Sequence, residues 1–277
     1  MTTRTALIVT CLACAGQALA AGFEFDTSRI QPVPRASLPE KRLTLKAFDT
    51  ANALRSFAAS TEKVESSEAV VGRRVADFTR SWRVERDTTE GSILIARRGE
   101  LAETSGTMDR EKLMKASTQL LGGFGVPSEE IGAVIARSLV TRDGDADAKE
   151  PGPAKLLLYK TFIIREINGV TVEGHRAVVT HAPDGSFVRA NLLWPPLASS
   201  GHKLSTKLTT AEIERRAQVA LEKERESEGK VLLRWKYFPV KARTGEVALR
   251  LMVEAWITPA TPGATETRAI NVPVDAF

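Results

Sequence analysis

The stretch LLLYKTFIIREINGVTVEGHRAVVTHAPDGSFVRANLLW, residues 156–194, decides the fold that we expect for this chain of 277 residues. Residues 156–167 form a largely apolar run, which is typical of a central strand. Asn168-Gly169 follows, and both residues tolerate the positive φ of a two-residue hairpin turn before a return strand over residues 170–181. Pro183-Asp184-Gly185 predicts a second turn, and residues 186–194 a third strand. The sequence therefore predicts an antiparallel meander.

Helices and further strands are predicted on both sides of this meander. Residues 81–98 predict a hairpin, and apolar residues at helical spacing predict helices over residues 109–121 and 128–139. Thr209 and Glu212 form a capping box that begins a later helix. Three strands are expected after that helix, over residues 231–240, 246–257 and 267–274. Because no βαβ alternation is present, we predict an α+β fold in which helices pack on antiparallel meanders.

The N-terminus has the pattern of a secretory signal peptide. Arg4 supplies a positive charge, residues 5–15 form a short apolar run, and Ala18-Leu19-Ala20 supplies the small residues of a cleavage site. We therefore expect residues 1–20 to be removed by cleavage after Ala20, and the mature protein to be periplasmic or secreted in a bacterium. The alternative is lipoprotein processing at Cys14.

Cleavage after Ala20 would remove both cysteines of the chain, Cys11 and Cys14, so we expect no disulfide and no cysteine-bound metal. Residues 21–40, with three prolines and little periodicity, predict an extended arm. A boundary near residue 200 is expected from Pro195-Pro196 and the Ser199-Ser200-Gly201 linker. The predicted domains are residues 41–200, which contain the meander, and residues 201–277.

Two segments resemble a known family. The pattern Ile167-Asn168-Gly169-Val170-Thr171-Val172-Glu173-Gly174, followed by Val178-Val179 and Asp184-Gly185-Ser186-Phe187-Val188, resembles the strands of PepSY and FTP domains, and residues 208–257 resemble a PepSY unit more loosely. Thr171 stands where the family often has proline. The resemblance implies a cystatin-like fold and a non-catalytic role in binding a protein partner. It further implies that this partner is a secreted peptidase that the protein inhibits or helps to fold.

Motifs for catalysis are missing from the sequence: it contains no His-Glu-x-x-His, no Gly-x-Ser-x-Gly and no dinucleotide fingerprint. Asp143, Asp145 and Asp147 imitate the start of a calcium loop, but Ala148 and Ala154 replace its turn glycine and its bidentate glutamate, which favours a solvated acidic loop. We therefore predict a protein that is not an enzyme and has no catalytic residues, metal site or cofactor.

A candidate binding face is predicted on the meander. A two-residue turn at Asn168-Gly169 would place His175 opposite Phe162 and Glu173 opposite Ile164, with Glu173 and His175 on one face of their strand. We interpret this pair as sheet-surface polar residues rather than as an acid–base pair. The four tryptophans are expected to pack rather than to form a ligand platform. The predicted face comprises Glu173, His175, Phe162 and Trp194.

The net charge of +5 and the pI near 9.3 are compatible with a polyanion-binding face, but the expected export argues against nucleic acid as a partner. After signal cleavage we expect no stable membrane insertion. The leading hypothesis is an exported, non-catalytic, PepSY/FTP-like binding protein that regulates a secreted peptidase or another envelope protein. The alternatives are a structural or accessory envelope protein with a non-peptidase partner, and an enzyme of unrecognised type.

Overall fold

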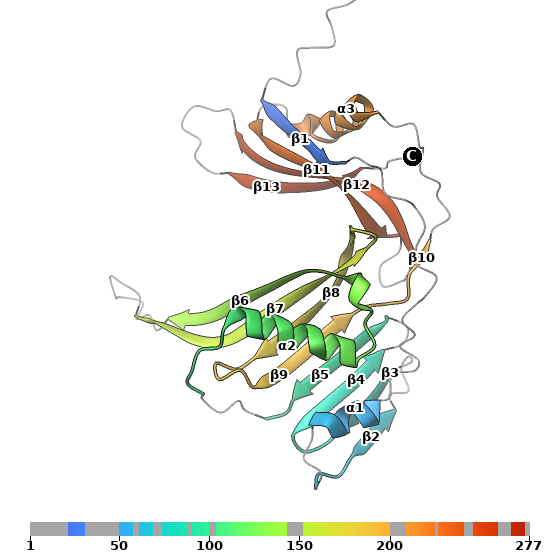
Figure 1. Cartoon of the computed structure of the whole chain (residues 1–277). Helices are drawn as coiled ribbons and strands as arrows, with labels where there is room; N and C mark the ends of the chain where they lie inside the picture. The colour runs from blue at the N-terminus through green and yellow to red at the C-terminus, as the bar shows by residue number, and fades with distance from the viewer. Residues whose placement is uncertain are drawn as a thin grey trace, which may run out of the picture. The chain divides into compact units, whose positions relative to one another are not determined.

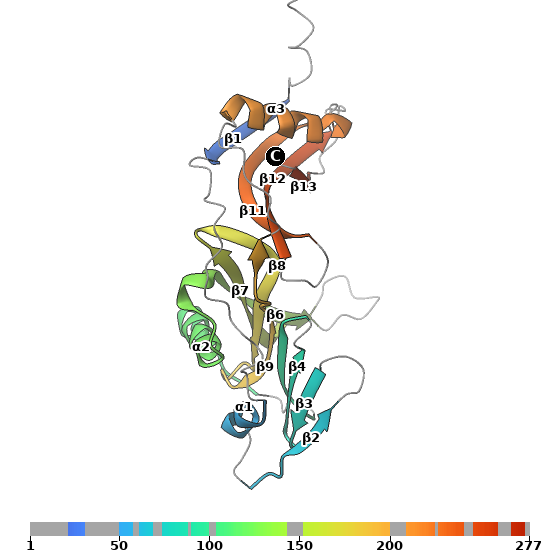
Figure 2. The same cartoon turned by 90° about the vertical axis from the view of Figure 1, so that its right-hand side faces the viewer.

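The computed structural model describes residues 22–30, 50–57, 61–68, 74–87, 90–99, 104–142, 152–199, 209–224, 227–240, 246–259 and 267–274. The chain divides into two compact units, drawn in Figures 1 and 2. Unit 1 contains residues 1–33, 205–235 and 250–277, and unit 2 contains residues 34–204 and 236–249.

Unit 2 is built on antiparallel strands that pair in the order β6-β7-β8-β9-β5-β4-β3-β2. Both predicted hairpin regions are confirmed: residues 81–98 form β4 and β5, and residues 156–194 form β7, β8 and β9. The strands are β2 (Glu65–Glu68), β3 (Arg74–Phe78), β4 (Trp82–Asp87), β5 (Ser92–Arg97), β6 (Ile131–Arg142), β7 (Ala154–Ile167), β8 (Val170–His181) and β9 (Phe187–Leu193).

The two α-helices of unit 2, α1 (Thr50–Phe57) and α2 (Arg110–Gly123), lie on one face of this sheet (Figures 1 and 2). Asp109 caps α2, because its Oδ1 accepts hydrogen bonds from the backbone N–H groups of Glu111 and Lys112 at 2.8 and 3.1 Å. The core lies between helices and sheet, where Leu54 and Leu121 pack with Ile95, Ile163 and other buried side chains. Among the described residues, no helix covers the opposite face of β6, β7 and β8.

Two short pairings complete unit 2. β10 (Ala198–Ser199) pairs in parallel with the first residues of β12 (Glu246–Pro259). The last part of β11 (Ser227–Pro239) pairs in parallel with β8, with Lys236 beside Thr171 and Tyr237 beside Val172.

Unit 1 contains α3 (Thr210–Ala220), β1 (Phe23–Arg29), β13 (Arg268–Val274), and the remaining parts of β11 and β12. β1 pairs in parallel with β11, and β13 pairs antiparallel with β12. The indole Nε1 of Trp235 donates a 2.9 Å hydrogen bond to the Ile30 carbonyl at the end of β1. The predicted cap of α3 is confirmed, since Thr209 Oγ1 accepts from the Glu212 N–H at 3.2 Å.

The predicted α+β fold class is wrong, because the chain is β-rich. The described residues contain thirteen strands and three α-helices, and the strands pair in both parallel and antiparallel directions. The largest error concerns residues 128–139, where helical spacing predicted a helix. The 3₁₀ turn η2 (Ser128–Glu130) leads there directly into β6, whose register with β7 shifts between Ile131 and Val134 and again after Leu139. These bulges disrupt the two-residue alternation by which a strand is recognised.

The sequence predicted a boundary near residue 200, with residues 201–277 forming the second unit. In the structure, residues 236–249 belong to unit 2 and residues 1–33 to unit 1. β1 lies inside the segment for which an extended arm is predicted.

Candidate functional site

A bulge in β8 decides where the predicted Glu173 and His175 lie. Thr171 pairs with Glu166, whereas the next regular pair joins Arg176 to Ile164, so the register shifts across Glu173, Gly174 and His175. Gly174 has a φ of +78°, which favours glycine. Buried residues occupy the even positions of β8 before the bulge and the odd positions after it, where Thr180 is buried as well.

The prediction that Glu173 and His175 share one face is therefore wrong, as are their predicted partners. Phe162 lies opposite Val178, not His175, and Ile164 lies opposite Arg176, not Glu173. A register change of one residue turns a strand's side chains to the other face of the sheet. His175 is consequently buried on the helix-covered face, while Glu173 is half-exposed on the other.

His175 belongs to a buried polar cluster centred on Arg165, whose side chain is 1% exposed. Arg165 Nε and Nη2 contact Glu130 Oε2 at 2.8 and 2.7 Å, and its Nη1 donates to the Pro195 carbonyl at 2.6 Å. Trp194 Nε1 donates to the same Glu130 oxygen at 2.9 Å. The arginine therefore joins two predicted residues, His175 and Trp194, on the inner face of the sheet.

The environment of His175 favours its neutral form. Burial, and then the neighbouring positive charge of Arg165, lower the pKa of His175 from 6.5 to about 4. Its Nδ1 lies 3.5 Å from Arg165 Nη1 and, facing a cation, acts as an acceptor with the ring proton on Nε2. Burial also lowers the pKa of Arg165, while Glu130 opposes that shift. This cluster uses its donors and acceptors internally, which is the behaviour of a structural network.

Glu173 forms an ion pair with Lys236, whose Nζ lies 2.8 Å from Glu173 Oε2. Lys236 comes from the end of β11, which pairs with β8 beside the bulge. The Lys236 side chain is mostly buried and that of Glu173 is partly exposed. Glu173 therefore helps to hold β11 against β8.

Phe162, the fourth predicted residue, lies on the face of the sheet opposite to the helices. The pairs Phe162–Ile135, Leu158–Leu139 and Leu156–Val140 bring apolar side chains of β7 and β6 together on this face. The β6 members remain exposed to solvent at 43% for Ile135, 41% for Leu139 and 50% for Val140. We define the open face as the side chains of Ile135, Arg137, Leu139, Val140, Leu156, Leu158, Lys160, Phe162, Ile164, Arg176 and Val178.

Cations interrupt the apolar surface of the open face. Arg137 lies directly opposite Lys160, an arrangement of like charges that destabilises a strand pair. Arg176 lies opposite Ile164. Within the described part of the chain, none of these three cations forms an ion pair. The open face thus combines exposed aliphatic side chains with three cations that form no ion pair with a carboxylate of the described residues.

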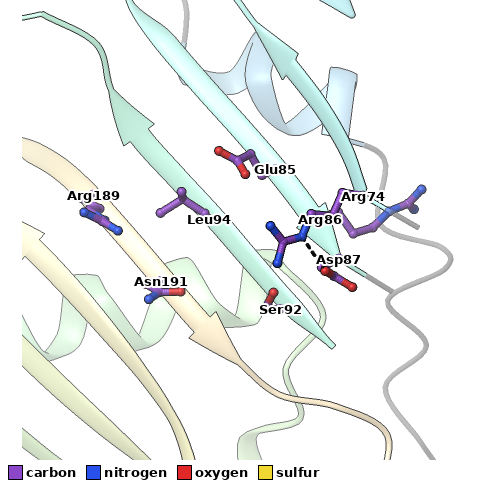
Figure 3. A pocket seen from close by; sticks show the side chains of 8 residues that line it. All are labelled: Arg74, Glu85, Arg86, Asp87, Ser92, Leu94, Arg189 and Asn191. Atoms are coloured by element: carbon purple, nitrogen blue, oxygen red, sulfur yellow. Dashed lines mark hydrogen bonds and ion pairs between the residues drawn. The ribbon is translucent and has the colours of Figure 1, made fainter. Parts of the chain in front are cut away.

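A small polar pocket with a volume of about 180 Å³ lies on β3, β4, β5 and β9 (Figure 3). Glu85, Leu94 and Asn191 lie opposite one another on neighbouring strands, and Arg74 Nε contacts Asp87 Oδ2 at 2.7 Å. Both arginines and carboxylates line this pocket. Its lining residues are Arg74, Glu85, Arg86, Asp87, Ser92, Leu94, Arg189 and Asn191.

Sequence reasoning missed Arg165, Glu130 and Lys236, and it missed the β6 half of the open face. Arg165 stands at an inward position of β7 between the apolar residues Ile163 and Ile167, a signal that could have marked it as buried and paired. Glu130 and Ile135 lay within the wrongly predicted helix, so no strand partner could be assigned to them.

Two predictions fall outside the described residues: the signal peptide and the loop of Asp143, Asp145 and Asp147. Of the tryptophans, Trp194 and Trp235 are buried and Trp256 is 47% exposed. The described residues include no group of three or more histidine, cysteine, aspartate or glutamate side chains that could hold a metal. They also include no helix with the length and apolar character needed to cross a membrane.

Comparison with known proteins yields little more. No family model matches the sequence. No curated protein matches it either. One solved structure, an uncharacterized protein from Eubacterium rectale ATCC 33656, is similar with a TM-score of 0.49 and 10% sequence identity, over 86% of this chain and 82% of that chain.

Proposed function

We propose that the protein is an exported, non-catalytic binding protein that presents the open face of unit 2 to a protein partner. The observation that carries this proposal is the open face itself. Ile135, Leu139 and Val140 are each at least 41% exposed and lie side by side with the apolar side chains of β7. Contiguous apolar surface on a soluble unit marks an interaction site, whereas scattered single residues do not.

The polar clusters of unit 2 support binding over catalysis. Arg165 contacts both Glu130 and His175, and all three residues are buried. A general base needs access to a substrate proton, and a side chain that is 4% exposed, like His175, gives little access. The side chains that reach solvent on the open face are aliphatic or cationic. Side chains of these two kinds suit contact with the surface of a partner protein.

The resemblance of residues 167–188 to PepSY and FTP domains suggests a secreted peptidase as the partner. In this role the protein would inhibit the peptidase or assist its folding. The second candidate, an accessory role toward another envelope protein, uses the same open face. The identity of the bound partner distinguishes the two roles.

Photocrosslinking from the open face tests the proposal. Phe162 is replaced by the photoreactive analogue p-benzoylphenylalanine in the protein expressed in its own host, a change that keeps the aromatic ring. The control places the same analogue at Val219, a 60% exposed apolar residue on α3 of unit 1. We expect irradiation to give a discrete adduct from position 162 and none from position 219.

Mass spectrometry then identifies the adduct and the N-terminus of the crosslinked protein. A peptidase in the adduct supports the regulatory role, and a non-peptidase envelope protein supports the accessory role. Equal labelling from both positions, or no adduct from position 162, contradicts the proposed binding face. A crosslinked chain that still begins at Met1 contradicts export.

A further inference from the structure

β6 offers a backbone edge as well as side chains. Among the described residues it pairs only with β7, so its other edge carries backbone N–H and C=O groups that no strand satisfies. Six consecutive residues, from Val134 to Leu139, keep a regular register between the two bulges. A long exposed strand edge with apolar side chains can pair with a strand of another chain. Most proteins prevent such pairing with charges, prolines, bulges or a covering segment.

The side chains along this regular stretch alternate in chemistry. Ile135, Arg137 and Leu139 point to the open face, because they pair with the outward residues Phe162, Lys160 and Leu158 of β7. An added strand would place alternate side chains beside these three residues. The added strand would match these positions best with an apolar residue beside Ile135, a carboxylate beside Arg137 and an apolar residue beside Leu139.

The positive charge argues against a second copy of this chain as the added strand. Symmetric antiparallel pairing of two β6 strands about Arg137 would place two guanidinium groups opposite each other, beside the Lys160 of each copy. Like charges opposite each other destabilise strand pairing. A carboxylate at the same position would instead lie beside Arg137 and offset the positive charge that Arg137 and Lys160 share.

We propose that β6 binds an extended acidic peptide segment of the partner by strand addition, with a carboxylate of that segment beside Arg137, on the side of β6 away from Lys160. This inference rests on the proposed function and specifies the partner's chemistry. A membrane surface is the less suitable occupant, because lipid headgroups do not satisfy a row of backbone N–H and C=O groups as a strand does.

Fluorescence anisotropy with labelled peptides tests the inference on the purified protein. The probe is a peptide of about seven residues in which Val, Glu and Leu alternate with Thr, matching the length of the regular edge. The comparison peptide has Lys in place of Glu. We expect the Glu peptide to bind at least about tenfold more tightly than the Lys peptide, since close charge complementarity is worth at least one decade in affinity.

A charge exchange makes the test specific. Arg137→Glu would place a carboxylate opposite Lys160, which favours the strand pair, so this variant is expected to remain folded. Its affinity for the Glu peptide should fall about tenfold, and its affinity for the Lys peptide should rise about tenfold. The control, Lys115→Glu on the exposed surface of α2, should leave both affinities unchanged.

Hydrogen exchange locates the bound peptide: protection should increase at Val134–Leu139 and not at β13. Equal affinity for the two peptides, or an unchanged preference in Arg137→Glu, overturns the inference. Tighter binding to phosphatidylglycerol vesicles than to the Glu peptide, lost in Arg137→Glu, would also overturn it and assign the cations to lipid. The crosslink from position 162 does not depend on strand addition, so failure of the peptide test leaves the proposed binding face testable by itself.

Discussion

Arg165 shows how one buried residue connects separate segments of unit 2. It contacts Glu130 before β6, His175 in the β8 bulge and the Pro195 carbonyl after β9. Trp194 packs against its guanidinium at 5.3 Å from the ring centroid and donates to the Glu130 carboxylate. Because these groups are buried, loss of one partner leaves another without compensation.

We expect Arg165→Met to destabilise unit 2 by about 3–5 kcal/mol, because it leaves the Glu130 carboxylate buried without its cation. The double variant Arg165→Met, Glu130→Gln removes the orphaned charge and keeps an acceptor for Trp194 Nε1. It should therefore be more stable than the single variant. Urea-dependent hydrogen exchange of β7 measures both, and a double variant that is less stable than Arg165→Met would contradict the role of the pair.

His175 should make stability depend on pH. Its pKa is about 4 in the folded chain and 6.5 ordinarily, so between these values the unfolded chain binds a proton that the folded chain does not. Stability should therefore fall as the pH falls from about 6.5 to 4, by roughly 3 kcal/mol from this residue. Urea denaturation at several pH values should show a shallower fall for His175→Asn.

Some pH dependence should remain in His175→Asn, because burial also lowers the pKa of His181. The comparison is therefore between the two slopes. Identical slopes for the wild type and His175→Asn would show that the folded protein does not hold His175 neutral.

At the scale of secondary structure elements, local turn chemistry could be predicted and bulges could not. Asn168 and Gly169 adopt φ values of 52° and 77°, which both residue types tolerate, and the hairpin forms where the sequence predicts it. The bulges in β6 and β8 are shifts in the register with β7. The local pattern of apolar residues carries no information about that register, so the bulges could not be predicted. Because of the β6 bulges, residues 128–139 were predicted as a helix although most of them form a strand. The β8 bulge places His175 and Glu173 on opposite faces of the sheet.

The β8 bulge gives a prediction with a matched control. A Cβ atom added at Gly174 or at Gly122 would meet nothing within 4 Å beyond the adjoining chain, so added volume is tolerated at both. Only Gly174 has a positive φ, +78°, which costs a side chain about 1–2 kcal/mol. Gly174→Ala should lower the unfolding free energy by about that amount, and Gly122→Ala at the end of α2 should not. Equal effects in thermal denaturation would contradict a strained bulge.

At the scale of the whole molecule, unit 1 depends on segments from distant parts of the sequence. Ile30 is fully buried and its carbonyl accepts the Trp235 hydrogen bond. We expect Ile30→Ala to destabilise unit 1 by about 2–5 kcal/mol through the cavity it leaves. Hydrogen exchange should show increased opening in β13 and little change in β7 of unit 2. Equal loss of protection in both strands would show that the two units unfold together.

The pairing of β1 with β11 also sets an order of events during synthesis. Ile30 and Trp235 are 205 residues apart, so β1 leaves the ribosome long before its partner strand exists. Contacts of such high sequence separation form slowly. Most of unit 2 is one continuous segment, residues 34–204. Unit 2 can therefore begin to fold before the partner strand of β1 has been made. The apolar side chains of β1 are thus exposed throughout translation, which makes this strand a natural target for a chaperone.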